Sequence, residues 1–157
     1  MLFDNFKGFQ TVKELKENGF DLVPDKKGVY LVIFNQKTKP IFLEKNIGGH
    51  FKGKDPTVPI ERLKSKWINN EEIIYIGQAG GNNSKATLRK RLKQYIQFGY
   101  GKPVGHWGGR LIWQLMNSDE LIIAWKETSE DPYIVESNMI NKFREVQGDR
   151  PFANLTK

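Results

Sequence analysis

Three short apolar runs, each followed by turn residues, form the most regular pattern in the chain. The run 28–34 is apolar at nearly every position, which is typical of a central strand that is covered on both faces. The run 72–77 contains β-branched residues and ends in a Gly-rich loop, and 121–125 is a third apolar run. We expect these three runs to form the core sheet, with 40–43 as a short partner strand.

Helical spacing of apolar residues marks the segments between the strands. The basic segment 85–97 carries an inward stripe of leucine, tyrosine and isoleucine. The stretch 129–132 supplies a capping residue followed by proline, and it predicts a helix that runs to about Val146 and stops at Gly148. Shorter helices are predicted at 1–20, 60–67 and 110–116. The sum is a small α/β domain, in which helices lie against a sheet of about three strands.

Composition supports a folded chain and excludes several classes of protein. Hydrophobic residues make up 38% of the 157 residues, which fits one domain with a real core. No apolar run approaches a membrane span and no charged-then-apolar leader follows Met1, so we expect a soluble cytosolic protein without a membrane partner. Because the chain has no cysteine, disulfides, Cys-ligated zinc and a thiol nucleophile are excluded.

The charge of the chain points to an anionic partner. Lysine and arginine number 25 against 18 acidic residues, which gives a net charge of +7. A basic surface attracts polyanions by neutralising phosphates and releasing counterions. Nucleic acid is therefore the favoured partner, and a generally lysine-rich surface is the alternative interpretation.

Glu136 is the most informative single residue. It lies three positions before Met139 and four before Ile140, so it shares the apolar face of its predicted helix. A buried glutamate is rare unless it is paired or metal-bound. Glu136 is therefore either a metal ligand or general base, or else a structural carboxylate favoured near a helix N-terminus.

The other polar candidates are less distinctive when each is taken alone. Tyr30 and Tyr75 lie inside apolar strands, where a core tyrosine is the ordinary explanation. Arg91 flanks the buried stripe of its helix and is able to reach inward. His106 lies in the Gly-rich loop 99–109, where an ordinary loop residue is the usual explanation, and with only two histidines in the chain there is no two-histidine metal motif. The segment 77–81 lacks both the Walker and the dinucleotide-binding glycine patterns.

Together these residues resemble a known family. The triplets Gly28-Val29-Tyr30 and Tyr75-Ile76-Gly77 resemble the paired motifs that name the GIY-YIG nucleases. The run Leu88-Arg89-Lys90-Arg91-Leu92 resembles the family helix that carries the catalytic arginine, here Arg91. Glu136 and Asn154 match the glutamate that holds the divalent cation and the terminal asparagine that closes the active site. The resemblance covers about residues 25–157.

The resemblance implies a three-stranded antiparallel sheet flanked by helices and a metal-dependent DNA endonuclease. The implied catalytic residues are Tyr30, Tyr75, Arg91, Glu136 and Asn154, with one Mg²⁺ (or Mn²⁺) on Glu136. A tyrosine hydroxyl, Tyr30 or Tyr75, would relay a proton from the attacking water, and Arg91 would stabilise the transition-state charge. Asn154 would orient either a ligand or the end of a strand.

Four departures from the family pattern modify these expectations. The two tyrosine motifs are far more widely separated than in the short family hairpin, so 35–71 is an insertion, either a substrate-facing flap or a packing element. Residues 1–24 form an N-terminal extension, and Gln78 stands where many relatives have lysine. We expect no appended DNA-binding domain, so that specificity comes from the insertion, from 106–110 or from a partner. The predicted substrate contacts are therefore Lys85, Arg89, His106, Trp107 and Arg110, with His106 as an alternative base.

Two rival functions stay open at the level of sequence. The first is a nucleic-acid-binding module that keeps the scaffold and the charge but does not cleave. The second is a small-ligand or protein-interaction domain in which the aromatic residues of the insertion form a docking surface.

Overall fold

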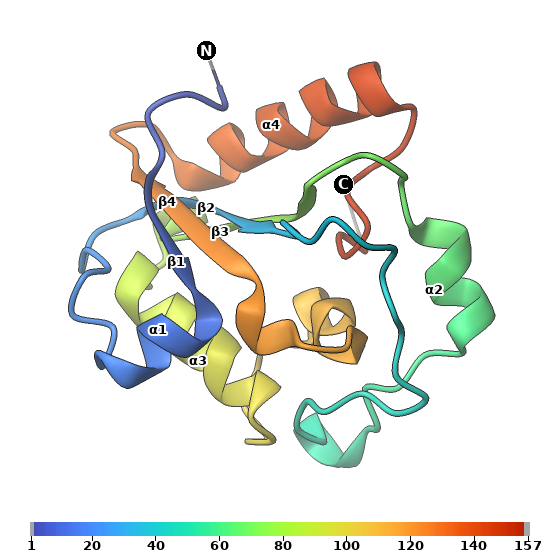
Figure 1. Ribbon diagram of the computed structural model, residues 1–157. Coiled ribbons are helices and arrows are strands. Elements are labelled where there is room, and N and C mark those ends of the chain that lie inside the picture. The colour runs from blue at the N-terminus through green and yellow to red at the C-terminus, as the bar shows by residue number, and fades with distance from the viewer. Residues whose placement is uncertain (1, 156–157) are drawn as a thin grey trace.

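The sheet has four strands, one more than predicted. The computed structural model describes residues 2–155, and residues 1, 156 and 157 of the predicted domain lie outside this range. The strands are β1 (Lys7–Thr11), β2 (Gly28–Ile33), β3 (Ile73–Ala79) and β4 (Ile122–Glu127). They form one open antiparallel sheet in the order β1-β4-β2-β3 (Figure 1). The chain is thus a mixed α/β protein, and the three predicted core strands are confirmed.

The N-terminal extension supplies the additional strand. The prediction of a helix over 1–20 is wrong for its first half, where β1 pairs with β4 through an irregular register around Phe9. A capping box starts α1 (Val12–Glu17) abruptly, because the Thr11 side chain accepts a hydrogen bond from the Glu14 backbone and Glu14 accepts one from Thr11. The helix therefore does not extend back past Thr11.

Strand β2 is the centre of the sheet, as its continuous apolar sequence predicts. It pairs with β3 on one side and with β4 on the other. Alternate residues point to opposite faces, so Val29 and Leu31 contribute to one core cluster while Tyr30 and Val32 contribute to the other. Both clusters are buried, which explains why this strand tolerates no charged residue.

Helices cover both faces of the sheet (Figure 1). Helix α4 (Pro132–Gln147) packs on the face of Val29 and Leu31, and it begins where the Asp131 side chain accepts a hydrogen bond from the Tyr133 backbone. The opposite face holds α1 and α3 (Leu88–Gly99), together with the 3₁₀ segment Trp107–Gln114. Among the described residues, no helix is long and apolar enough to cross a membrane.

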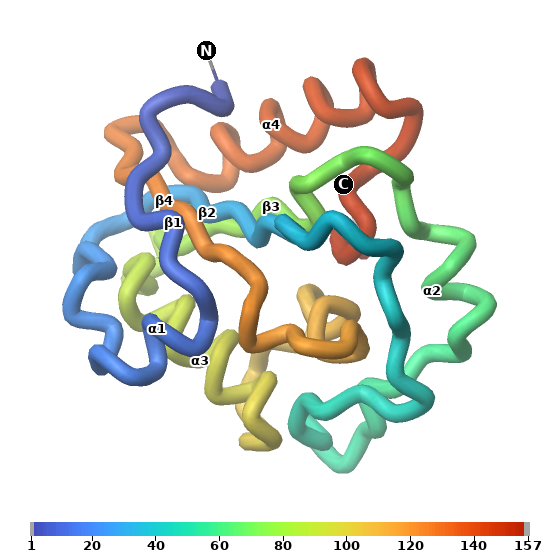
Figure 2. Tube along the Cα trace, in the orientation of Figure 1, coloured from blue at the N-terminus to red at the C-terminus, as the bar shows by residue number. Residues whose placement is uncertain are grey.

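The segment 35–71, which the sequence predicts to be an insertion, joins β2 to β3 (Figure 2). It contains α2 (Ile60–Lys66), but the predicted strand 40–43 is reduced to one bridge between Phe42 and Leu115. The fully buried side chain of Gln114 donates hydrogen bonds to the carbonyls of Leu43 and Val58 and accepts one from the Val58 backbone. Of the two roles that the sequence left open, flap or packing element, this geometry fits packing.

Candidate active site

Tyr30 and Tyr75 lie side by side on the sheet face that α3 covers. Tyr30 is opposite Gly77 in the register, and Tyr75 is two positions from Gly77, so the tyrosines are diagonal neighbours on one face. Their ring centroids are 6.1 Å apart. A Cβ on Gly77 would overlap the Tyr30 ring, which explains why a glycine stands there. The paired motifs of the sequence therefore meet in space.

Burial controls the ionisation of both hydroxyls. It raises the pKa of Tyr30 well above its ordinary value, and the neighbouring Tyr75 adds to this rise. Burial and the charge of Glu136 raise the pKa of Tyr75 to about 12, while Arg91 and a hydrogen bond with Tyr30 oppose the rise. Tyr75 is the less enclosed of the two, at 8% exposed against 1% for Tyr30.

A third tyrosine, Tyr95, completes the cluster and was not predicted as a site residue. Its ring centroid is 5.5 Å from that of Tyr75 and 6.2 Å from that of Tyr30. The Tyr95 hydroxyl donates a 2.6 Å hydrogen bond to the Gly109 carbonyl. Its position four residues after Arg91, on the same helix face, was the sequence signal that could have identified it.

His106 is buried against the tyrosines, although the sequence predicted a loop residue that contacts substrate. It is 1% exposed, and its Nε2 lies 3.1 Å from the Tyr30 hydroxyl. Its ring stacks on Tyr95 with a centroid distance of 3.8 Å and an interplanar angle of 10°. Burial, together with the positive charge of Arg91, holds the pKa of His106 well below its ordinary value. The side chain is therefore neutral, and it lies beneath the surface.

Arg91 reaches the cluster from the first turns of α3. The start of this helix is fixed to the chain that precedes β2, because the Leu88 backbone donates to the Lys26 carbonyl and the Thr87 hydroxyl donates to Asp25. The Arg91 guanidinium donates a 3.3 Å hydrogen bond to the Gly105 carbonyl, next to His106. Its charge acts on both site tyrosines. The structure thus brings Arg91 to the predicted place.

Glu136 lies on the inner face of α4 and is only 8% exposed, as its position in the apolar stripe predicted. Its charge raises the pKa of Tyr75 and of Tyr30, so the carboxylate is electrostatically coupled to the cluster. Among residues 2–155, no group of three histidine or acidic side chains is placed to hold a metal. One carboxylate nevertheless fits Mg²⁺, which keeps several waters and often binds through one or two carboxylates and a substrate phosphate.

Asn154 binds the backbone of β3. Its Oδ1 accepts a 3.0 Å hydrogen bond from the Ile76 N–H, and its Nδ2 donates a 2.9 Å bond to the Ile76 carbonyl. The neighbouring Ala153 N–H donates to the Ile74 carbonyl. The C-terminal tail therefore supplies partners to the open edge of β3, between Tyr75 and Gly77. Of the two roles predicted for Asn154, this geometry fits the ordering of a strand.

The predicted substrate contacts are dispersed. Lys85 is exposed, whereas Arg89 is tied by a 2.8 Å hydrogen bond from its Nε to the Val23 carbonyl. Arg110 stacks over the Trp107 ring at 4.5 Å and donates to the Trp107 carbonyl. These two residues remain partly exposed, so they form a surface beside the buried His106.

Gln78, where the family resemblance would place a lysine, binds the backbone of the Gly-rich loop that follows β3. Its Oε1 accepts a 2.9 Å hydrogen bond from the Gly81 N–H. The side chain therefore shapes the turn that joins β3 to the segment before α3. This contact fits a connecting role for 77–81, which also lacks the phosphate-binding glycine patterns.

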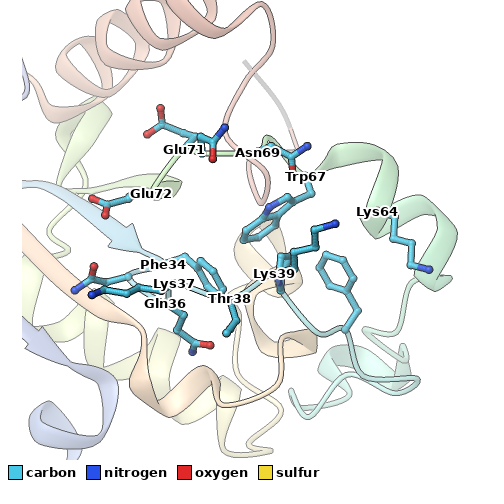
Figure 3. A pocket seen from close by; sticks show the side chains of 14 residues that line it. Phe34, Gln36, Lys37, Thr38, Lys39, Lys64, Trp67, Asn69, Glu71 and Glu72 are labelled. Atoms are coloured by element: carbon cyan, nitrogen blue, oxygen red, sulfur yellow. The ribbon is translucent and has the colours of Figure 1, made fainter.

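A groove of about 930 Å³ lies elsewhere (Figure 3). It is lined by 34–40, Phe42, Lys64, Trp67 and 69–72, and none of the predicted catalytic residues lines it. Figure 3 shows Lys64 across the groove from Glu71 and Glu72. Because both signs of charge line it, the groove lacks the single-sign field that favours a phosphate chain.

Comparisons of the chain with protein-family models, with curated proteins and with solved structures find no match.

Proposed function

We propose that the protein is a metal-dependent endonuclease of the GIY-YIG type that hydrolyses phosphodiester bonds in DNA. The observation that carries the proposal is the pair Tyr30 and Tyr75, to which the charges of Arg91 and Glu136 are electrostatically coupled, although the four residues come from four separate elements. Perturbed titratable groups that cluster in this way are typical of functional sites. The net charge of +7 supports an anionic polymer as the substrate.

Tyr75 is the better candidate for the base. Tyr75 is the less enclosed residue of the pair, and both Arg91 and a hydrogen bond with Tyr30 oppose the rise of its pKa to about 12. As a phenolate, Tyr75 takes a proton from the attacking water while the hydroxide oxygen bonds to phosphorus. The bond from phosphorus to the leaving oxygen breaks, and a solvent water protonates that oxygen.

Arg91 and Glu136 have different roles, namely stabilisation of the phosphate charge and binding of the metal. The guanidinium of Arg91 offers forked N–H donors to the phosphate oxygens, where negative charge grows in the transition state. Glu136 is the residue that would hold Mg²⁺. When bound, the ion supplies positive charge that stabilises the phosphate and lowers the pKa of neighbouring groups. Asn154 and Gly77 act indirectly, by fixing β3 and leaving room for the Tyr30 ring.

Cleavage of supercoiled and branched DNA in Mg²⁺ or Mn²⁺ tests the proposal. We expect Tyr75→Phe to lower the turnover rate by about 10²–10⁴-fold, the usual contribution of a general base. Glu136→Gln removes the negative charge with little change of shape and should abolish metal-dependent cleavage. Glu145→Gln on the same helix is the matched control, because Glu145 is exposed and forms a surface ion pair with Lys142. Cleavage by Glu136→Gln at the wild-type rate would contradict the mechanism.

A non-cleaving nucleic-acid-binding module is the second candidate. The observation that favours it is the near-complete burial of Tyr30 beneath His106, which leaves little of that hydroxyl for a reacting water. This function predicts DNA affinity that falls steeply with salt and no turnover with either metal. Binding measured by fluorescence anisotropy at two salt concentrations, beside the cleavage assay, distinguishes the two candidates.

A further inference from the structure

His106 is held in one orientation by contacts on several sides. One face of its ring stacks on Tyr95, whose hydroxyl is itself bonded to Gly109. The His106 backbone N–H donates a 2.9 Å hydrogen bond to the Val104 carbonyl, and Arg91 holds the carbonyl of the preceding residue. These contacts fix both the plane of the His106 ring and the backbone that carries it, which packing alone does not require.

The two ring nitrogens of His106 have different surroundings. Nε2 faces the Tyr30 hydroxyl at 3.1 Å. Nδ1 is buried, and within the described part of the chain it forms no hydrogen bond of good geometry, since the only acceptor that acts on the ring is the carbonyl of His106 itself, which is poorly aligned. A neutral imidazole carries one N–H, so that hydrogen is either shared with Tyr30 or buried without an acceptor.

The free-energy cost of each protonation form of His106 decides which form is present. The imidazolium is disfavoured, because the ring is buried and the charge of Arg91 is close. With hydrogen on Nδ1, an N–H donor would be left unpaired in the interior, and orphaned N–H groups are the rarer kind of unsatisfied buried group. With hydrogen on Nε2, the only donor of the ring is used and a lone pair alone remains unmatched.

We propose that His106 is a positioning residue that donates its Nε2–H to the Tyr30 hydroxyl oxygen, so that the Tyr30 hydrogen is directed toward Tyr75. The Tyr30 oxygen then has its own hydrogen free for the next acceptor in the cluster. The result is a buried chain of donors, His106 to Tyr30 to Tyr75, which stabilises negative charge on the last oxygen. A neutral imidazole that acts as a hydrogen-bond donor is an established way of stabilising a developing anion.

The effect on turnover rests on the proposed nuclease function, but the hydrogen-bond chain does not. No proton is transferred to His106 in this scheme. The residue stays neutral throughout, and the proton of the attacking water resides on Tyr75. This separates the proposal from a role of His106 as the base, which requires the ring to become charged beside Arg91.

Nitrogen NMR of the imidazoles in the metal-free protein tests the tautomer without any variant. The chain has only two histidines, so His50→Gln assigns the remaining signal to His106. We expect hydrogen on Nε2 and a bare Nδ1. In Tyr30→Phe, which lacks the acceptor, the Nε2 hydrogen should exchange faster with solvent. Hydrogen on Nδ1 in the wild-type protein would overturn the proposal.

Two substitutions test the consequence for catalysis. His106→Phe keeps an aromatic ring on Tyr95 but removes the donor, and His106→Gln places an amide N–H near the position of Nε2. We expect His106→Phe to lower kcat by about 10–100-fold, as for the outer hydrogen-bond partners of metal ligands. His106→Gln should recover most of kcat, and KM should be nearly the same in both variants.

An equal loss of kcat in both variants would overturn the donor role and favour proton acceptance by His106, because an amide is unable to take up a proton. If wild-type protein cleaves no DNA yet the NMR result is as expected, the hydrogen-bond chain stands and only the nuclease function fails. The two proposals are therefore tested separately.

Discussion

Asn154 offers the most direct test of how the tail orders the candidate site. Its amide forms two hydrogen bonds with the backbone of Ile76 and is 5% exposed. In Asn154→Ala, the N–H and C=O of Ile76 lose these partners. A buried group left unsatisfied costs about 1–3 kcal/mol, so two such groups give about 2–6 kcal/mol. Because β3 is an edge strand, water is able to reach part of the gap, and we expect a loss of about 2–4 kcal/mol.

Urea unfolding, followed by tryptophan fluorescence, measures this loss. With a slope of about 1–3 kcal/mol per molar urea, a loss of about 2–4 kcal/mol should lower the midpoint by at least about 0.7 M. Asn69→Ala, at an exposed asparagine, is the control and should change stability by less than about 0.5 kcal/mol. An unfolding midpoint for Asn154→Ala equal to that of the control would refute the reasoning.

Asn154→Asp refines the test, since it keeps the shape and the acceptor but turns a carboxylate oxygen toward the Ile76 carbonyl. Burial and this repulsion favour the protonated carboxyl, which donates as the amide does, so the pKa of the new carboxyl is raised. A raised native pKa means that the variant is closest to wild type at low pH and loses stability as pH rises. A deficit that is independent of pH between 4 and 7 would contradict the assigned hydrogen-bond direction.

Three further predictions concern the tyrosine cluster. In Gly77→Ala the new Cβ overlaps the Tyr30 ring, so calorimetry should show a loss of about 1–3 kcal/mol that Gly108→Ala, at an open position, does not share. Because His106 stays neutral in the native state, the wild-type protein should lose stability as pH falls below about 6.5. This dependence of stability on pH should be weaker in His106→Phe. An equal change in the urea midpoint of both proteins between pH 7 and pH 5 would count against this. The pKa of Tyr75 is raised to about 12 in the folded protein. Its contribution to folding stability is therefore fully present below the unfolded-state pKa near 10 and is lost as pH rises toward 12. Tyr75→Phe should remove this alkaline loss, and an unchanged alkaline transition would argue against a buried hydroxyl.

The elements set by local chemistry were predictable from sequence. Strand β2 is apolar throughout because both of its faces are buried, and this property is visible without any partner. Helix α4 begins at the Asp131 cap and ends at Gly148, and each of these residues bonds backbone groups that are close to it in sequence. The position of Glu136 on the buried face followed from helical spacing alone.

Tertiary structure decided where the remaining polar groups find partners. Strand β1 exists because β4 offers an edge, and the segment 1–20 alone carries no sign of that pairing. The burial of His106 depends on Tyr30 and Tyr95, which are supplied by a distant strand and a distant helix. Asn154 likewise needs the backbone of Ile76. Spacing along a chain reveals which face a side chain occupies, but a hydrogen bond between distant segments is fixed only when folding brings the two atoms together.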